Sequence, residues 1–372
     1  MKYDLIATTT FGIEAVTAKE LKKLGYDNLT VENGSVTFQG TDIDIARANM
    51  WLRTADRVYI KIAEFKAETF EELFQGTKAI NWGDFIPVDG NIHVVGKSVR
   101  STLFSVSDCQ AIVKKAIVES MKRKYKKDWF SEEGPEYKVQ VALLKDIVTL
   151  SIDTTGAGLH KRGYREYAGE APIKETLAAA MILISGWEAE KQLADPFCGS
   201  GTIPIEAALI GKNIAPGLNR DFIAEQWQNI DSKVWSQARR EAQKAIKDID
   251  FRILASDIDG DVLRTARQNA EKAGVKDLIA FQKLPMEQFS SHKKYGYMIS
   301  NPPYGERLGE EKVVQQLYRE IGRLYRELDH WKFFILTSHP YFEKLFGKKS
   351  DKNRKLYNGR LQCYYYQYYR ED

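Results

Sequence analysis

The feature that most constrains this chain is an alternation of short apolar runs with amphipathic runs from Ala171 onward. The apolar runs are KQLADPF, FRILASDID, LIAFQKL, YGYMISNPP and WKFFILTSH, and runs with a helical period among them include TIPIEAALIG, DVLRTARQNAEKAG and VVQQLYREIGRLYREL. Strands that alternate with helices pair in parallel, because each helix carries the chain back across one face of the sheet. The pattern predicts an α/β fold with a doubly wound sheet.

The last residues, KLYNGRLQCYYYQYYR, carry a hairpin signal. Asn358-Gly359 lies between two strand-like runs, and Asn-Gly suits a two-residue turn in which both residues have positive φ. We therefore expect the sheet to gain an antiparallel C-terminal hairpin. The aromatic run from Cys363 to Tyr369 is expected to be a sheet edge packed in the core, rather than a platform on which bases stack, and we assign it no function.

The first part of the chain mixes strand-like and helix-like runs without a regular order, which is typical of small α+β units. At roughly 100–200 residues per domain, 372 residues suggest two or three domains. We predict small units over residues 1–60 and 61–155, a linker rich in glycine and charge over 156–170, and a large domain over 171–372.

Composition narrows the class of protein. With 43% hydrophobic and 28% charged residues the chain should bury a core, and its net charge of +4 permits a polyanionic partner without requiring one. No apolar run reaches the roughly 18 residues of a membrane span, and MKYDLIATTT lacks the order of a signal peptide, so we expect a cytoplasmic protein with no membrane partner. Cys109, Cys198 and Cys363 lie far apart, which predicts neither a disulfide framework nor a metal site.

The segment DPFCGSGT follows an apolar run and opens a helix, the place where doubly wound sheets bind ligands. It lacks the third glycine and the acidic residue of the dinucleotide fingerprint, and it has no Walker lysine, so SAM (S-adenosylmethionine) fits better than NAD or a triphosphate. Asp257 ends the next apolar run and could accept the ribose hydroxyls, while Asp195 would face the methionine half. The alternative is a structural turn that binds no ligand and only joins the strand to the helix. The candidate residues of this loop are Asp195, Phe197, Cys198, Gly199, Gly201 and Thr202.

Asn301-Pro302-Pro303-Tyr304 follows the apolar run YMIS, so it should stand at the same edge of the sheet. A base amine is a poor nucleophile, and oxygens of Asn301 and the Pro302 backbone could accept its two N–H groups. The prolines would keep the backbone rigid, and Tyr304 could stack on the base. The alternatives are a structural proline turn, and Cys198 as a nucleophile attacking a pyrimidine.

Two basic clusters are candidates for RNA contact. One gathers Lys122, Arg123, Lys124, Lys126 and Lys127 around Tyr125 and Trp129, where a solvated helix end is an equally good reading. The other, His160 to Arg165, could touch RNA or cofactor or simply form a surface linker.

DPFCGSGT, ASDID and NPPYGERL, with GYREYAGEAPIKETLAAA ahead of them, resemble the THUMP-domain RNA methyltransferases, closest to the bacterial 23S ribosomal RNA guanine-N2 family. The resemblance covers nearly the whole chain. It implies a ferredoxin-like region over 1–60, a THUMP domain that binds structured RNA over 61–155, and a Rossmann-like class I methyltransferase domain over 171–372. Lys97 and Arg100 lie in the THUMP-like run NIHVVGKSVRSTLFS and join the RNA-binding candidates.

The resemblance also assigns roles to residues. Asp195, Phe197, Gly199 and Gly201 would line the SAM site, Asp257 and Ile258 would hold ribose and adenine, and Asn301 to Tyr304 would hold the amine. Tyr164, Lys174 and Thr176 would lie near the cofactor. The family often has an acidic residue for the adenine amine where this chain reads QKLPMEQF, and Glu287 is the substitute we expect.

The tetrapeptide specifies an amine and not the molecule that carries it. The leading prediction is methylation of guanine N2 in 23S rRNA, and tRNA is the second substrate. Related tetrapeptide enzymes also methylate adenine N6 in DNA and glutamine amides in proteins. A different class of function, a non-catalytic RNA-binding factor in ribosome assembly, is disfavoured by the intact loop and tetrapeptide.

Overall fold

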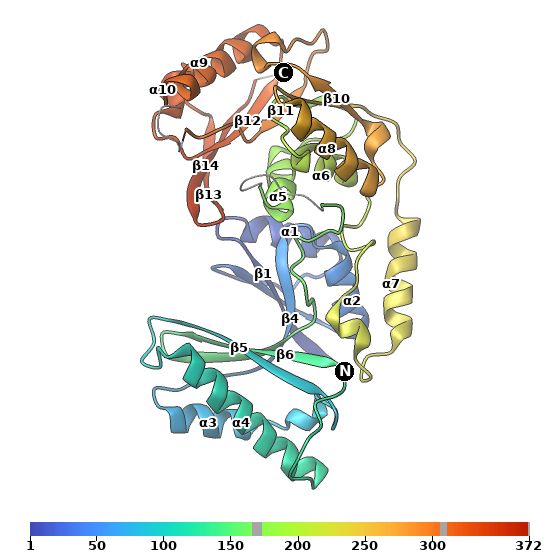
Figure 1. Cartoon of the computed structure of the whole chain (residues 1–372), viewed down its shortest axis with the longest axis vertical. Helices are drawn as coiled ribbons and strands as arrows, with labels where there is room; N and C mark the ends of the chain where they lie inside the picture. Colours follow the sequence, from blue (N-terminus) through green and yellow to red (C-terminus); the bar gives the residue numbers. More distant parts are fainter. Residues whose placement is uncertain (166–172, 306–310, 371–372) are drawn as a thin grey trace.

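The computed structural model describes residues 1–165, 173–305 and 311–370, so part of the predicted linker (166–170) and the ERL part of the last motif (306–308) lie outside it. Two seven-stranded sheets dominate the structure, one in each half of the chain (Figure 1). Across the described residues, no helix combines the length and apolarity that a bilayer span would need.

The first sheet joins both predicted N-terminal units. Its strand order is β2-β3-β1-β4-β7-β6-β5, so β4 of the first unit pairs with β7 of the second along Tyr59–Lys66. Only β5 and β6 pair in parallel. The elements are β1 (Tyr3–Thr9), α1 (Glu14–Lys23), β2 (Thr30–Glu32), β3 (Ser35–Gly40), α2 (Asp42–Trp51), β4 (Ala55–Lys66), α3 (Phe70–Lys78), η1 (Trp82–Asp84), β5 (Asn91–Val99), α4 (Val106–Tyr125), β6 (Glu136–Leu144) and β7 (Ile147–Asp153).

The second sheet has the predicted doubly wound form, with order β10-β9-β8-β11-β12-β14-β13. Its first five strands are parallel, and the chain switches direction across the sheet between β8 and β11. The elements are α5 (Glu175–Ser185), β8 (Leu193–Asp195), α6 (Thr202–Gly211), η2 (Ile223–Gln226), α7 (Ser232–Lys244), β9 (Ile253–Asp257), α8 (Gly260–Lys272), η3 (Lys276–Leu278), β10 (Ile279–Lys283), η4 (Met286–Gln288), β11 (Tyr297–Ser300), α9 (Glu311–Glu327), β12 (Lys332–Thr337), α10 (Phe342–Phe346), β13 (Lys352–Asn358) and β14 (Leu361–Tyr368).

The predicted C-terminal hairpin forms, but its turn lies one residue later than expected: Asn358 pairs with Leu361, so Gly359, with φ +63°, and Arg360 are the turn residues. The aromatic run differs from the prediction in its place. β14 is an inner strand that pairs with β12 and β13, so β13 takes the sheet edge. Tyr365 and Tyr368 are fully buried, as expected of core residues.

A segment between α6 and β9 leaves the second half and packs on the first. Phe222, Trp227 and Trp235 belong to the apolar core under the N-terminal sheet. Trp227 stacks on Tyr137 at 4.7 Å between ring centroids. Figure 1 shows α7 beside α2, away from the other helices of its own half. Strand and helix alternation did not predict that η2 and α7 pack here, because alternation alone does not say on which sheet a helix packs.

The predicted linker is anchored rather than free. The Arg162 guanidinium is buried and donates to both carboxylate oxygens of Glu206 in α6 at 3.3 Å, and it also donates to the Arg53 carbonyl at 2.6 Å. The Tyr164 hydroxyl donates to the same Glu206 carboxylate at 3.1 Å. Arg162 therefore joins the two halves of the chain, and Tyr164 binds the same carboxylate within the second half. Their predicted contact with RNA or cofactor stays a prediction.

Candidate active site

The glycine loop and the tetrapeptide meet at the carboxyl edge of the second sheet. β8 runs into the loop that opens α6, and β11, which pairs with β8, runs into Asn301. The Ser300 hydroxyl donates to Oδ1 of Asp195 at 2.6 Å, so the ends of the two strands are fixed to each other. The site therefore sits at the topological switch point, where open α/β sheets bind ligands.

Gly199 and Gly201 of the loop have different surroundings. Gly199 has φ +51°, and a Cβ added there would meet no atom within 4 Å, so its backbone borders open space that a ligand can enter. Gly201 has φ +87°, but its Cβ would lie 3.2 Å from the Ala266 Cβ in α8. Its missing side chain therefore serves the packing of α6 on α8, and its predicted place in the SAM site stays a prediction.

The next strand ends beside this loop. Asp257 accepts the Gly199 N–H through Oδ2 and the Asp259 N–H through Oδ1, both at 3.0 Å, which fixes the carboxylate at the mouth of the loop. Ile258 follows with 68% of its surface exposed, and an exposed apolar side chain at this edge suits a flat aromatic ring. An anchored carboxylate, an apolar face and an open backbone fit the adenosyl half of SAM.

Asp195 is buried and turned inward. Besides Ser300, it accepts the Phe197 N–H at 3.2 Å, and burial raises its pKa to about 7, with Asp257 adding to the rise. Its carboxyl group thus joins strands within the protein, which differs from the predicted position facing the methionine half. Phe197 is half-buried against the core under α9.

The remaining loop residues are interior. Burial raises the pKa of the Cys198 thiol well above its usual value, which keeps it protonated and disfavours it as a nucleophile. Thr202 is buried at the first turn of α6, and its hydroxyl accepts a hydrogen bond from Arg165. The predicted adenine contact Glu287 lies exposed in η4.

The tetrapeptide has an internal hydrogen bond that the sequence did not predict. The Tyr304 hydroxyl donates to Oδ1 of Asn301, and the Tyr304 ring packs against the core beside the hairpin. In this position Tyr304 orients the Asn301 amide, and stacking of its partly buried ring on a base stays a prediction. The Asn301 oxygen has two lone pairs and can still accept an N–H from a ligand. Pro302 is buried and Pro303 is exposed.

Sequence reasoning missed the support behind the tetrapeptide. The fully buried Tyr318 of α9 donates to the Pro303 carbonyl at 2.8 Å, and its hydroxyl lies 2.8 Å from Oγ1 of Thr337 at the end of β12. The His339 ring packs edge-on against Tyr318 at 5.4 Å. The only signal for Tyr318 was its place on the apolar face of the helix, which indicates burial but not a partner.

The predicted RNA-binding residues fall into two places. Lys97 and Arg100 lie at the end of β5, whereas Lys122, Arg123, Lys124, Lys126 and Lys127 lie at the end of α4. α4 returns along β5, so the two groups are at opposite ends of this unit. In the α4 group, Lys122 pairs with Glu119 and Lys124 pairs with Asp84, while Arg123 donates to Asn81.

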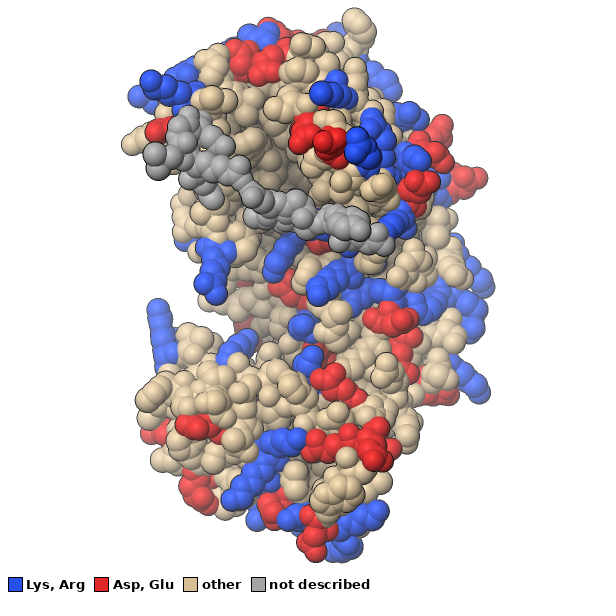
Figure 2. All heavy atoms as spheres, viewed as in Figure 1, with Lys and Arg blue, Asp and Glu red and all other residues tan. Residues whose placement is uncertain are grey.

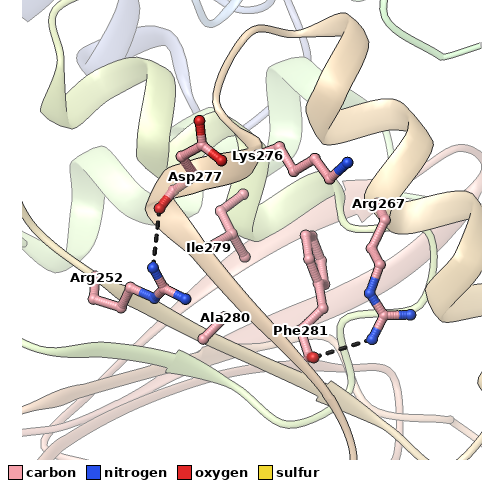
Figure 3. A pocket seen from close by; sticks show the side chains of 7 residues that line it. All are labelled: Arg252, Arg267, Lys276, Asp277, Ile279, Ala280 and Phe281. Atoms are coloured by element: carbon pink, nitrogen blue, oxygen red, sulfur yellow. Dashed lines mark hydrogen bonds between the residues drawn. The ribbon is translucent and has the colours of Figure 1, made fainter.

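A shallow pocket of about 350 Å³ lies elsewhere on the second half, against the edge strand β10 (Figure 3). Arg252 donates to the Asp277 carbonyl and Arg267 donates to the Phe281 carbonyl, both at 3.1 Å. The pocket shares no residue with the glycine loop or the tetrapeptide, so it is not the predicted cofactor site. Among the residues that the structure describes, no group of acidic, histidine or cysteine side chains is placed to hold a metal ion.

Known protein families match this architecture in three parts. Residues 162–367 match the family described as RMKL-like, methyltransferase domain. Residues 4–59 match the RlmL ferredoxin-like domain, and residues 67–153 match the THUMP domain.

Relatives match over nearly all of the chain. The chain is 54% identical over 371 residues to the Bacillus subtilis protein named "Putative RNA methyltransferase YpsC". The alignment covers 99% of this chain and 96% of that protein. The chain is 36% identical over 377 residues to the ribosomal RNA large subunit methyltransferase K/L of Legionella pneumophila, which covers 98% of this chain and 53% of that protein. The chain thus spans about half the length of the K/L protein.

Solved structures have the same fold over the whole length of this chain. A predicted N6-adenine-specific DNA methylase from Listeria monocytogenes has a TM-score of 0.95 and 51% identity, covering 100% of this chain and 97% of that chain. SMU.472, solved in complex with SAH, has a TM-score of 0.95 and 46% identity, covering 100% of this chain and 99% of that chain. The predicted fold class, family resemblance and SAM cofactor are confirmed. The chain belongs to the RMKL-like family of SAM-dependent methyltransferases, with a ferredoxin-like and a THUMP domain ahead of the catalytic domain.

Proposed function

We propose that the protein methylates the exocyclic N2 amine of a guanine in 23S rRNA. The observation that carries the proposal is the Asn301 amide oxygen, held by Tyr304 at the carboxyl edge, one hydrogen-bonded strand away from the glycine loop. An oxygen fixed there can accept an amine N–H and orient the nitrogen toward a methyl donor in the loop. Positioning of this kind is most of what a direct transfer requires.

The residues divide the work between two ligands. Gly199, Asp257 and Ile258 would hold SAM, which supplies an electrophilic methyl group when bound. Asn301 and the Pro302 carbonyl would accept the two N–H groups of the amine. The amine nitrogen would take the methyl carbon as the S–C bond of the donor breaks and S-adenosylhomocysteine leaves, so positive charge would develop on the nitrogen and its proton would pass to water. Asn301 stabilises that charge, so its contribution grows along the reaction.

RNA as the substrate is supported by the THUMP domain and by the names of the relatives. The K/L relative is a ribosomal RNA large-subunit enzyme, which favours 23S rRNA over tRNA. The Listeria structure carries an adenine-N6 DNA name, so adenine N6 is the second candidate for the amine. Both amines are exocyclic and conjugated to the ring, and the same acceptors serve either.

Nucleoside mass spectrometry tests the proposal. The purified protein is incubated with labelled SAM and with 23S rRNA, 16S rRNA or tRNA from a strain that lacks its gene. We expect N2-methylguanosine in 23S rRNA alone, and none with Asn301→Ala. Label in tRNA or in N6-methyladenosine would assign the alternative substrate or amine. Label in none of the three RNAs, from protein that binds SAM, would refute RNA methylation.

A further inference from the structure

We propose that the RNA docks on one end of the THUMP unit, the sheet tip formed by Arg100, Phe104 and Lys145, and not on the basic end of α4. This inference rests on the proposed function and goes beyond it, because it chooses between two basic ends of the same domain. Sequence alone marked the α4 end as the denser cluster of charge.

The sheet tip exposes apolar groups that the fold leaves uncovered. Phe104 has 83% of its surface exposed, Leu144 has 57% and Val99 has 50%. Val99 pairs with Leu144 in the β5–β6 ladder, so these side chains lie together at the end of the sheet. The Thr102 N–H donates to Asp146 at 2.6 Å, which ties the loop that carries Phe104 to the β6–β7 turn. Phe104 is therefore an exposed ring on an anchored loop.

The cations of the tip are available to a ligand. Within residues 1–165, 173–305 and 311–370, the Arg100 and Lys145 side chains have no hydrogen bond or ion pair. Lys66 at the same tip pairs with Glu68, and in the α4 cluster Lys122 and Lys124 are paired. Lys126 and Lys127 of the α4 cluster are also without a partner among the described residues, so free cations are present at both ends. The choice of the tip therefore rests on its anchored loop and on the hollow that it shares with the catalytic edge.

The backbone at the tip also departs from what its residues prefer. Arg100, Lys145 and Asp146 have φ of +51°, +52° and +64°, a region that glycine and asparagine favour. Lys145 and Asp146 occupy a two-residue hairpin turn between Leu144 and Ile147, where Asn-Gly is the preferred pair. Lys126 at the α4 end has φ +55° as well, so positive φ at a lysine is found at both ends and does not choose between them.

The tip and the catalytic edge border one hollow. The β13–β14 turn projects beyond the carboxyl ends of the parallel strands, because Thr337 of β12 pairs with Tyr364 near the start of β14. This hairpin touches the first half through Phe11 and Tyr357, at 6.5 Å between ring centroids, and it exposes Lys355 and Arg360. Figure 2 shows a hollow between the two halves with lysine and arginine on both walls.

The length of the hollow indicates how long a ligand that contacts both walls must be. β4 links its two walls, from Ala55 beside the hairpin contact to Lys66 at the tip, and its 12 residues extend over about 35 Å. A ligand that contacts both ends of this strand must be much longer than one nucleotide, as an RNA chain is. Free cations for phosphates and an exposed ring for a base are the pair of features that single-stranded or looped RNA uses.

Matched substitutions at the two ends test the inference. The tip variant is Arg100→Gln with Lys145→Gln, and its control is Lys126→Gln with Lys127→Gln at the α4 end. A second pair compares Phe104→Ala with Trp129→Ala, which is 75% exposed. All six residues are exposed, so unfolding midpoints and SAM affinity should stay at the wild-type values.

The measurement is binding to protein-free 23S rRNA as a function of salt. The tip charge variant should lower the slope of log K against log salt by about 0.7–0.9 for each lost phosphate contact, and Phe104→Ala should weaken binding about tenfold. The α4 variants should bind within about twofold of wild type. Equal losses at both ends, or a loss at the α4 end alone, would overturn the inference.

A trimmed RNA separates docking from damage to the catalytic half. Once the methylated nucleotide is mapped, a stem-loop that carries it but cannot span the hollow should be methylated equally by wild type and the tip variant. A tip variant that is slow on this short RNA would overturn docking as the cause. If the wild type methylates no RNA at all, the proposed function fails first, and that outcome differs from methylation that is unaffected by tip substitutions, which refutes only the docking surface.

Discussion

The Ser300 hydroxyl and the Asp195 carboxylate form a 2.6 Å hydrogen bond that ties the end of β11 to the end of β8. Each residue comes directly before a segment of the site, the tetrapeptide after Ser300 and the glycine loop after Asp195. The distance between the amine site and the cofactor site is therefore set by a buried side-chain contact as well as by the strand ladder.

The burial of Asp195 predicts a pH dependence of stability, and the Ser300 hydrogen bond opposes part of the shift. The pKa of Asp195 is raised from 3.8 to about 7 by burial, so between about pH 4 and pH 7 the folded protein holds a proton that the unfolded chain has released. The Asp195 contribution to the free energy of unfolding is therefore full below pH 4, falls as pH rises, and is lost above pH 7. Relative to wild type, Asp195→Asn should gain stability across this window by on the order of 1 kcal/mol per pH unit.

Urea unfolding of both proteins at pH 5, 6, 7 and 8 measures this difference. Asp261→Asn, which removes an exposed carboxylate on α8, is the control for loss of a negative charge. A constant difference between Asp195→Asn and wild type from pH 5 to 7 would contradict a raised pKa.

Asn301 should affect turnover more than binding. Removing one preorganised polar group that acts in the transition state typically costs on the order of 10²–10³ in rate, so Asn301→Ala should fall in that range. Asn301→Asp keeps an acceptor oxygen and should be milder. SAM affinity should not change in either variant. Single-turnover transfer with saturating SAM measures the effect, and a loss below about threefold would remove Asn301 from the mechanism.

Gly199→Arg should abolish SAM binding, because the new side chain would fill the open space that the loop borders. Asp257→Ala should weaken SAM binding through loss of the ribose acceptor and of the bond to the Gly199 N–H. Gly186→Arg is the matched control, since Gly186 also has positive φ, +69°, and open surroundings but lies at the end of α5. Calorimetric titration with SAM compares the three variants, and wild-type affinity in the first two would refute the assigned site.

Tyr318→Phe should separate positioning from packing. The variant keeps the ring and loses the hydroxyl bonds to Pro303 and Thr337, so we expect about tenfold slower turnover with unchanged KM for RNA. Tyr325→Phe is the control on the same helix, because its hydroxyl also donates to a backbone carbonyl, that of Tyr369 at 3.1 Å. Each should cost about 1 kcal/mol of stability. Equal turnover in the two variants would reduce Tyr318 to a packing role.

Local patterns predicted the parts of this fold that depend on local rules. The C-terminal hairpin and the strand before Asn301 follow from turn chemistry and periodicity. The inner position of β14 and the Asp195–Ser300 bond depend on which strands become neighbours, and the residues that meet there are 105 positions apart in sequence. The contact of Tyr304 with Asn301 is local, but the sequence could not show it either, since a free ring and a bonded hydroxyl have the same residue pattern.

The segment that carries η2 and α7 limits how this protein can be rearranged. Phe222 and Trp235 belong to the second half of the chain but complete the core under the N-terminal sheet. Recombination therefore cannot transfer the catalytic half alone to another protein without breaking that core. In a separated catalytic half these two aromatic side chains would be exposed to solvent. The N-terminal sheet would lose part of its apolar core. Bidentate pairing of Arg47 with Glu241, at 2.8 Å for both bonds, adds a polar lock to the same joint. The two halves therefore have to be inherited together, and a fusion protein that folds must contain both.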